Sequence, residues 1–305
     1  MARHPYFQTT LGLCVFATLA MPVFAQSITA NHVRVDEISD NFDDPSWNYN
    51  YAAQSSANGK WRESFRGVPE TLQRVATPAG GPAGSTGALS IRSVDNGKDA
   101  YRTQDDFLTR DYSASMGRYP ARADLPIITT QVYLPPVSEL EADWFIAGFR
   151  TEARSNDRMG SGNAVGYYYP SIWINYYPQS GQGHISQTSP YLSVRLGDGF
   201  SSDTLPASPY LPNTGWWTLG LSFDEAGIAY YYARSGTDEL TSSDIIFDST
   251  RFATTHASGV NPFMDSLAYS YFSVGQIQGP ENSPNLLLDN FNVYRARRKG
   301  EGGNK

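Results

Sequence analysis

The segment from Tyr167 to Tyr177 (YYYPSIWINYY) alternates apolar residues with aromatic and small polar ones at the two-residue period of a β-strand. One side of this strand would be apolar and face a core: Tyr168, Pro170, Ile172, Ile174 and Tyr176. The other side would present Tyr167, Tyr169, Ser171, Trp173, Asn175 and Tyr177. A strand that faces only water has little reason to display a row of rings. Because aromatic rings stack on sugar faces, this side predicts a saccharide-binding surface.

A second segment, Trp144 to Arg154 (WFIAGFRTEAR), divides in the same way. Its polar side carries Trp144 and ends in Arg150, Glu152 and Arg154. If the two segments are neighbouring antiparallel strands, their polar sides form one surface. Arg and Glu would then hydrogen-bond sugar hydroxyls or a sugar carboxylate beside the rings. The alternative is a solvent-facing ladder of ion pairs, which contributes little to stability.

Other polar residues are expected to join this surface by alternation. The segment from Ile127 to Leu134 contributes Gln131 and Tyr133, and the segment from Tyr191 to Leu196 contributes Arg195. His184 lies in the GQGH turn that follows the tyrosine-rich strand, which would place it beside the groove. A lone histidine is more often a surface hydrogen-bonding group than a catalyst, so both interpretations of His184 stay open.

Acidic residues near both ends of the chain suggest a calcium site. Asp43 lies in DNFDDP near the start, and Asp289 lies in LLLDNFNVY near the end. Oxygen-rich clusters of this kind hold Ca²⁺, which takes six to eight hard ligands. The alternative is that these aspartates cap turns. Transition-metal sites are disfavoured, because the chain has one cysteine, Cys14, and its histidines are scattered.

The first 25 residues predict export through a cleaved signal peptide. A short basic start precedes the apolar run LGLCVFATLA, which is too short to span a bilayer, and small residues lead up to Ala25. Removing this segment would leave 22 Lys and Arg against 30 Asp and Glu, a net charge of −8. This balance excludes nucleic acid as the expected partner, and no later segment predicts membrane insertion. We expect a secreted or periplasmic protein without disulfides.

Composition and turn spacing favour an all-β domain, because 27 Gly and 19 Pro punctuate short strand-like runs. We expect one antiparallel two-sheet β-sandwich of jelly-roll type over residues 26–294 and a disordered basic tail over 295–305. Long irregular loops are expected at residues 76–87, 95–126 and 198–215. Ten strands are predicted: Val33 to Ile38, Ala88 to Val94, Ile127 to Leu134, Trp144 to Arg154, Tyr167 to Tyr177, Tyr191 to Leu196, Trp216 to Phe223, Ile228 to Ala233, Asp265 to Gln276 and Asn285 to Tyr294.

The chain resembles the concanavalin A-like lectin and glucanase superfamily of jelly rolls, which includes laminin-G-like modules. The resemblance rests on NFDDPSW (Asn41 to Trp47), ALSIRS (Ala88 to Ser93), the central aromatic strands and LLLDNFNVY (Leu286 to Tyr294). It implies that the opening and closing strands pair and that a concave sheet carries the ligand. It does not by itself imply one activity.

Two enzymatic branches of this superfamily were compared with the residues. Laminarinase-like hydrolases carry Glu-x-Asp-x-x-Glu on one strand, whereas here Glu139-Leu-Glu141-Ala-Asp143 has another order. Jelly-roll alginate lyases carry an Arg-Thr/Ser-Glu-x-Arg strand, which Arg150-Thr151-Glu152-Ala153-Arg154 matches, but Gln131-Val-Tyr133 lacks their histidine and their third motif is absent. The resemblance therefore leaves the activity open.

Three functions follow from these residues. The leading one is binding of an extracellular polysaccharide, in which Tyr169, Trp173 and Tyr177 stack on sugars while the Arg and Glu side chains orient them. The second is β-elimination on a uronate glycan. There Arg150, Arg154 and Gln131 would neutralise the carboxylate, and Tyr169, Tyr177 or His184 would move protons. A hydrolase that uses Glu152 is a variant of this reading, and a structural or adhesion protein is the third.

Overall fold

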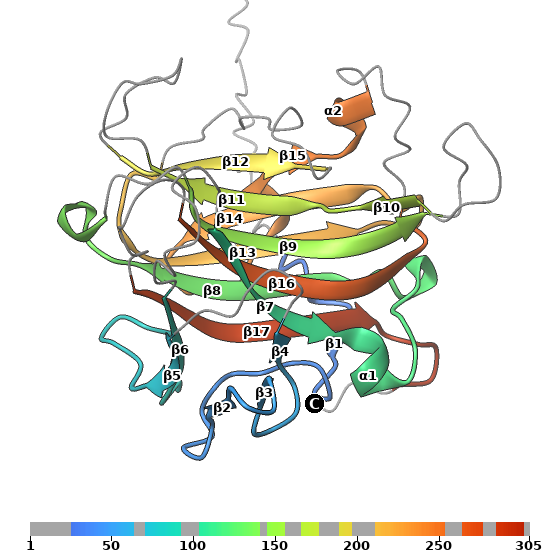
Figure 1. Cartoon of the computed structure of the whole chain (residues 1–305). Helices are drawn as coiled ribbons and strands as arrows, with labels where there is room; N and C mark the ends of the chain where they lie inside the picture. Colours follow the sequence, from blue (N-terminus) through green and yellow to red (C-terminus); the bar gives the residue numbers. More distant parts are fainter. Residues whose placement is uncertain are drawn as a thin grey trace, which may run out of the picture.

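The computed structural model describes residues 26–63, 71–92, 104–140, 145–155, 166–176, 189–196, 211–253, 264–276 and 285–301. Within them, the strands form two antiparallel sheets (Figure 1). In spatial order, the nine-stranded sheet comprises β12 (Tyr191–Arg195), β11 (Ser171–Asn175), β9 (Phe145–Ser155), β16 (Ser266–Gln276), β7 (Gln104–Asp111), β4 (Arg62–Glu63), β3 (Ser55–Ser56) and β2 (Tyr49–Asn50), with β10 (Gly166–Tyr168) also paired to β9. The eight-stranded sheet comprises β15 (Ile245–Asp248), β14 (Ala229–Ser235), β13 (Gly215–Phe223), β8 (Ile127–Leu134), β17 (Leu286–Ala296), β6 (Ala88–Arg92) and β5 (Thr71–Val75), with β1 (His32–Arg34) paired to β17.

In the described residues, helical structure consists of short pieces between strands. They are α1 (Tyr112–Met116), α2 (Thr250–Ala253) and the 3₁₀ turns η1 (Arg122–Asp124), η2 (Val137–Glu139) and η4 (Ser242–Asp244). None of the helices in the described part of the chain is long and apolar enough to cross a membrane. The predicted all-β, two-sheet antiparallel sandwich is therefore confirmed.

The core lies between the two sheets. It is formed by every second residue of each strand, because successive side chains point to opposite faces of a sheet. Ile128 and Val132 of β8 are fully buried from one side, and Phe149 of β9 and Ile172 of β11 are buried from the other. Each such side chain contributes roughly 1.5–3 kcal/mol relative to an exposed position. Inward-facing residues of both sheets belong to one continuous cluster, so the opposite side of each sheet is left for other roles.

The opening segment is fixed against the closing strand, as the family resemblance implies. β1 pairs with the end of β17, and the Asp40 amide donates to the Phe291 carbonyl at 2.8 Å. Buried Asp40 then accepts hydrogen bonds from the Trp61 indole and the Asn58 amide, each at 2.9 Å. The guanidinium of buried Arg110 donates to backbone carbonyls of the same segment, including Ile38 O at 3.0 Å. This group of side chains, the Asp40–Arg110 cluster, closes one end of the sandwich.

Several predicted boundaries differ from the structure; the first predicted strand, Val33 to Ile38, for example, is shortened to β1. Residues 95–126 are not irregular throughout, because β7 and α1 lie within them. The tyrosine-rich strand is interrupted at Pro170, which lacks an amide hydrogen, and forms β10 and β11. The chain is still in β17 at Arg295, where the sequence predicts the tail to begin, and Arg295 forms a two-point ion pair with Glu301 at 2.8 Å.

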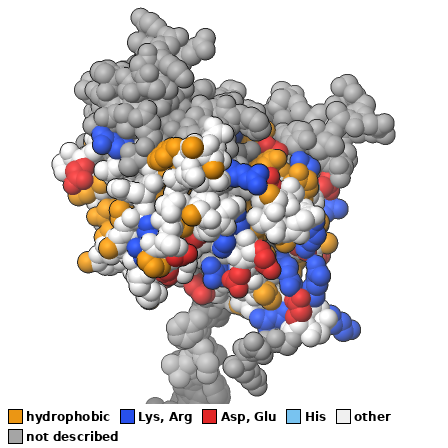
Figure 2. Space-filling model, turned by 60° about the horizontal axis from the view of Figure 1, so that its bottom comes forward, with side chains coloured by type: hydrophobic (Ala, Val, Ile, Leu, Met, Phe, Trp, Pro, Cys, Tyr) orange, Lys and Arg blue, Asp and Glu red, His pale blue; other side chains and the backbone are white. Residues whose placement is uncertain are grey.

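The end of the molecule at which β2 to β5 lie has a mixed charge distribution. Figure 2 views the molecule from this end and shows Lys and Arg side chains interspersed with Asp and Glu side chains. Two of the ion pairs in the described chain, Arg118 with Asp124 and Arg298 with Asp124, share one carboxylate. A broad single-sign surface is not seen on this face, so any charge selectivity must come from a local arrangement.

Candidate functional site

The two segments whose polar sides are predicted to form one surface are adjacent strands. β9 and β11 pair antiparallel, with Arg150 opposite Ser171 and Gly148 opposite Trp173. β12 pairs with the other edge of β11 and places Arg195 opposite Ser171. Because residues that are directly opposite each other share a face, the expected common surface of the three strands is confirmed.

This surface continues across the sheet as a row of paired positions. Beyond Arg150 the row passes through Tyr271 of β16 and Thr109 of β7 to Arg62 of β4. Three arginines, Arg62, Arg150 and Arg195, therefore occupy one cross-strand row on the side of the sheet that faces away from the core. We call these three residues the arginine row.

Trp173 lies beneath the arginine row rather than open to solvent. Only 2% of this residue is exposed, which corrects the expectation that its ring is displayed. The Arg195 guanidinium lies 4.4 Å from the ring centroid and that of Arg150 lies 5.7 Å from it. The indole nitrogen donates to Ser171 Oγ at 2.8 Å. Cation–π attraction and this hydrogen bond hold the tryptophan as a support for the two cations.

Asn175 is also buried, and the reason is a local hydrogen-bond network. Its amide nitrogen donates to Ser193 Oγ at 3.0 Å and to the Trp173 carbonyl at 3.3 Å. With 3% of the residue exposed, Asn175 acts within the sheet and does not present its amide to a ligand.

The part of the row nearest Tyr169 is more accessible. Tyr169 is half-buried, and the Arg150 guanidinium lies 5.1 Å from its ring centroid. Arg150 is thus placed between two aromatic rings, those of Tyr169 and Trp173. Held in this way, the guanidinium loses less conformational freedom when it binds a planar anion.

Glu152 and Arg154 lie one and two positions farther along the same face. Glu152 is opposite Tyr269, which in turn is opposite Asp111, so two carboxylates flank this phenol in a second row. Burial, followed by Asp111 and other neighbours, raises the pKa of Tyr269 and favours the protonated phenol. Arg154 stacks on Tyr119, with 4.0 Å between guanidinium and ring centroid, and donates to its hydroxyl at 3.1 Å.

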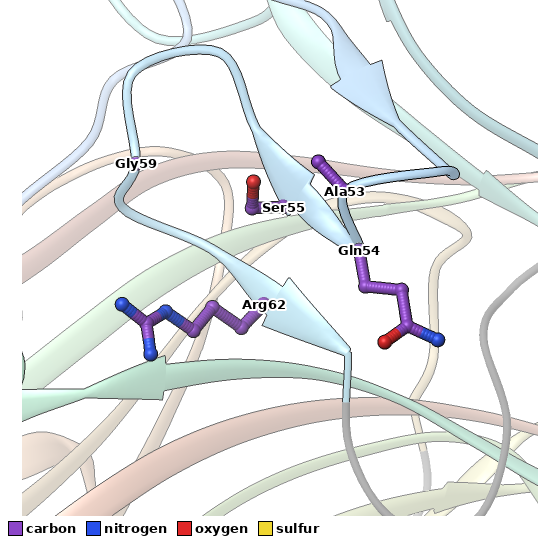
Figure 3. A pocket seen from close by; sticks show the side chains of 5 residues that line it. All are labelled: Ala53, Gln54, Ser55, Gly59 and Arg62. Atoms are coloured by element: carbon purple, nitrogen blue, oxygen red, sulfur yellow. The ribbon is translucent and has the colours of Figure 1, made fainter.

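The far end of the arginine row is open. Arg62 is exposed and borders a hollow of about 380 Å³ between β3 and β4. In Figure 3 the Arg62 side chain extends from β4 and the Gln54 side chain from the residue before β3, while Gly59 lies in the loop between these strands. A ligand that follows the row would therefore reach an accessible cation at this end.

Gln131 and Tyr133 do not belong to this surface. Their strand, β8, is in the eight-stranded sheet, so the expectation that they join Arg150 is wrong. Gln131 Nε2 donates to the Thr237 carbonyl at 2.6 Å, and the Tyr133 ring packs on Trp216 with 5.5 Å between centroids. Alternation indicates which side of a strand a residue occupies, but not which sheet the strand joins.

Several predicted residues lie outside what the structure describes. Trp144, Tyr177 and His184 fall outside the described residues, and Tyr167 is described only through its backbone pairing with Arg154. Conversely, Tyr269, Asp111 and Tyr119 flank the surface and were not predicted. Alternation along residues 265–276 could have indicated Tyr269. No comparable signal marks Tyr119, which reaches Arg154 from a turn.

Asp43 and Asp289 come together as expected, with one hydroxyl between them. Ser85 Oγ lies 2.7 Å from Asp289 Oδ2 and 3.5 Å from Asp43 Oδ1. Burial, and secondarily the charges of Asp43 and Asp40, raise the pKa of Asp289 to about 7. The oxygen chemistry suits a hard cation. Within the described residues, however, no group of three acidic, histidine or cysteine side chains converges.

Asp43 is at the same time a turn-capping residue, which is the alternative that the sequence left open. Its Oδ1 accepts from the Thr86 and Gly87 amides at 2.5 and 3.1 Å, and its Oδ2 accepts from Asn41 at 2.6 Å. A cation at this position would have to share a carboxylate that already joins two loops.

Comparisons with known proteins give low-identity structural matches. No protein-family model and no curated protein sequence matches the chain. It is similar to a carbohydrate esterase from Shiga toxin-encoding bacteriophage phi24B (13% identity, TM-score 0.48, 87% of this chain and 100% of that one). It is also similar to the Ca²⁺/Man3GlcNAc-bound VIP36 exoplasmic/lumenal domain (13%, 0.45, 88% and 92%) and to the cellulose-induced protein Cip1 (12%, 0.46, 87% and 100%). With TM-scores below 0.5, these similarities assign no function to the chain.

Proposed function

We propose that this protein is an exported carbohydrate-recognising protein that binds an acidic polysaccharide along the arginine row. The observation that carries the proposal is the register that places Arg62, Arg150 and Arg195 in one row across the outward face. Guanidinium groups bind carboxylates through two parallel hydrogen bonds, which a neutral sugar does not offer.

The spacing of the row suits a polymer. Neighbouring strands lie about 4.8 Å apart, so Arg195 and Arg150, two strands apart, are separated by about 10 Å. Arg150 and Arg62, three strands apart, are separated by about 14 Å. A chain that crosses the strands would pass exposed Arg62 and half-buried Arg150, with Tyr169 beside the latter, and would end at Arg195, which is 6% exposed.

Binding of uronate polymers to arginine variants tests the proposal. Hydrogen bonds to charged groups are worth roughly 1.5–3 kcal/mol, so Arg150→Ala should weaken binding by about ten- to a hundredfold. The matched control is Arg234→Ala, which removes an arginine of β14 on the other sheet. Retention on a panel of immobilised alginate, polygalacturonate and hyaluronan measures the effect. Equal retention of wild type and Arg150→Ala on every polymer would contradict the proposal.

A lyase activity on the same polymer is the second candidate, favoured by the contact between Arg150 and Tyr169. Arg150 would neutralise the uronate carboxylate, and a Tyr169 phenolate would remove the C5 proton. The C5–H electrons form the C4=C5 double bond, the C4–O bond breaks, and the leaving oxygen takes up a proton. Incubation with the same polymers should then produce the ultraviolet absorbance of an unsaturated uronate, and Tyr169→Phe should abolish it. If the wild type produces no absorbance change, the lyase activity is contradicted and polysaccharide binding is the only one of the two functions that stands.

A structural calcium ion between Asp43 and Asp289 is part of the same proposal. It is supported by the convergence of both carboxylates on Ser85 Oγ, which also lies 3.2 Å from the Gly87 carbonyl oxygen. A bound ion would stabilise the folded state by mass action. Ca²⁺ should raise the unfolding midpoint of the wild type and not that of Asp289→Asn, whereas equal midpoints with Ca²⁺ and with EDTA would count against the ion.

A further inference from the structure

The outward face of the eight-stranded sheet carries a separate hollow of about 380 Å³. Its floor is formed by residues that the register places on the side away from the core. Gln131 of β8 is opposite Thr218 of β13, and Thr129 of β8 is opposite Asn292 of β17. All four line the hollow, and its volume lies within the usual range of small-molecule sites.

The floor is a chain of side-chain amides. Gln131 Nε2 donates to the Thr237 carbonyl at 2.6 Å, and Gln131 Oε1 accepts from Asn290 Nδ2 at 2.9 Å. Asn292 Nδ2 donates to the Asn290 carbonyl at 3.0 Å. These bonds fix all three amides with defined donor and acceptor positions, as a site for directional hydrogen bonding requires.

One hydrogen-bond acceptor among these three amides has no donor within the described residues. Asn292 Oδ1 is buried and receives no hydrogen bond from the residues that the structure describes. Most buried polar atoms have a partner, and leaving an acceptor unpaired is costly. A ligand hydroxyl in the hollow would satisfy it once the Asn292 side chain turns this oxygen toward the hollow.

The backbone beneath the hollow is irregular at the same point. The register between β17 and β8 shifts between Asp289 and Asn292, and Asn290 has a φ of 45°. Asparagine tolerates this left-handed region better than most residues, but it remains uncommon inside a strand. Such bulges occur preferentially beside binding sites, where they redirect a side chain, and here the bulge directs the Asn290 amide to Gln131.

The charges at the rim of the hollow disfavour an anionic ligand. Three charged residues border it: Arg34, Asp238 and Glu239. Arg34 pairs with Asp36 at 3.3 Å, and Asp238 pairs with Arg234 at 3.2 Å. The rim therefore offers no excess of positive charge, in contrast to the arginine row.

We infer that this hollow is a second binding site, for a neutral, hydroxyl-rich ligand such as the end of an uncharged saccharide. The amides of Gln131, Asn290 and Asn292 hold its hydroxyls, with Asn292 Oδ1 accepting a hydrogen bond from one of them. The site lies on the sheet opposite the arginine row and does not depend on the proposed function of that row.

An array of neutral mono- and oligosaccharides, followed by calorimetric titration with the best-retained sugar, tests the inference. Asn292→Ala should weaken binding about tenfold and Thr129→Val about threefold, the latter without leaving a cavity. Asn213→Ala removes an exposed asparagine outside the hollow and should bind as the wild type does. Arg150→Ala should also retain the neutral sugar, which separates this site from the arginine row.

Three results would overturn the inference. The wild type retains no neutral sugar, or both hollow variants bind as tightly as the wild type, or Arg150→Ala removes the binding. Thermal unfolding of each variant accompanies the titration. The Thr129→Val titration then decides the outcome if Asn292→Ala does not fold.

Discussion

The Asp40–Arg110 cluster and the arginine row use the same kinds of side chain in opposite ways. In the cluster, the Asp40 carboxylate accepts hydrogen bonds from two indoles, one side-chain amide and one backbone amide, and Arg110 donates only to backbone carbonyls. In the row, Arg150 and Arg195 lie over the face of an aromatic ring. Cation–π attraction to a ring orients a guanidinium from the side of its planar face, whereas the carbonyls around Arg110 accept hydrogen bonds from its N–H groups.

The difference separates polar residues that hold the fold from polar residues for which we propose a role in ligand binding. Arg110 is 1% exposed, and burial lowers its pKa to about 10, so its role is to close the end of the sandwich. In the row, Arg62 is exposed and borders a hollow, Arg150 is half-buried, and Arg195 is buried at 6% exposure. Substitutions in the cluster should therefore change stability, and substitutions in the row should change binding.

The largest effect is expected from Asp40→Ala. It removes a buried carboxylate and leaves the Trp61 and Asn58 donors without their acceptor. Breaking a buried charged network by removing one partner costs about 3–5 kcal/mol. Urea unfolding measures the loss, and Asp44→Ala, at an exposed turn, is the control that should leave the midpoint nearly unchanged. A loss of less than about 1 kcal/mol in the unfolding free energy of Asp40→Ala would show that the cluster contributes no more than a surface interaction does.

A smaller, pH-dependent effect is expected at Asp289. Because its pKa is raised to about 7 in the folded state from 3.8, the folded state holds this proton more tightly. Its contribution to stability is therefore full below about pH 4 and is lost as the pH rises through 7. In EDTA, Asp289→Asn should remove this component, which amounts to a few kcal/mol at about 1.4 kcal/mol per pKa unit. If the free energy of unfolding depends on pH in the same way in wild type and variant, the pKa of Asp289 is not raised in the folded state.

At Arg195 we expect a change in binding together with a smaller loss of stability than in Asp40→Ala. Arg195→Lys keeps the charge but loses the planar group over Trp173, so affinity for a uronate polymer should fall about tenfold. The unfolding free energy should fall by about 2 kcal/mol, because Arg195 and Trp173 are both buried and desolvated cation–π contacts contribute about that much. Trp173 fluorescence should shift in the same variant. A large loss of stability with unchanged affinity would show that Arg195 holds the fold, as the Asp40–Arg110 cluster does, and does not bind the polymer.

The smallest effect is expected at the Arg295–Glu301 ion pair. Hydrogen bonds from Arg295 lower the pKa of Glu301 to about 2, yet this carboxylate is solvent-accessible. Screening by solvent leaves such pairs with little net contribution. Glu301→Gln should leave both the unfolding midpoint and polymer binding unchanged within error, and a clear shift in either would show that the closing segment is coupled to the rest of the sheet.

The sequence predicts the binding surface well where strands alternate and poorly where they do not. The strands of Arg150, Trp173 and Arg195 alternate clearly, so their common face could be predicted. β7 escapes prediction because its inward side includes Arg110, a charged residue at a core position. The two-residue strands β2 to β4 are too short to show a period, so Arg62 could not be placed in the row. These errors arise where tertiary contacts override the local pattern.

Other features of the site depend on spatial arrangement alone. Alternation places Gln131 on the polar side of β8 but cannot assign β8 to a sheet, because strand order is set by packing. The burial of Trp173 likewise depends on guanidinium groups from neighbouring strands. Aromatic content alone therefore suggests an open stacking platform, whereas the structure indicates a cationic surface supported from below.

The most direct test of the central claim compares one uronate polymer with its carboxyl-reduced, neutral counterpart, titrated into wild type and Arg150→Ala. The arginine row predicts that the wild type binds the acidic polymer at least tenfold more tightly than the neutral one, and that Arg150→Ala loses most of this preference. Equal affinity of the wild type for both polymers, or a preference that survives in Arg150→Ala, would contradict it.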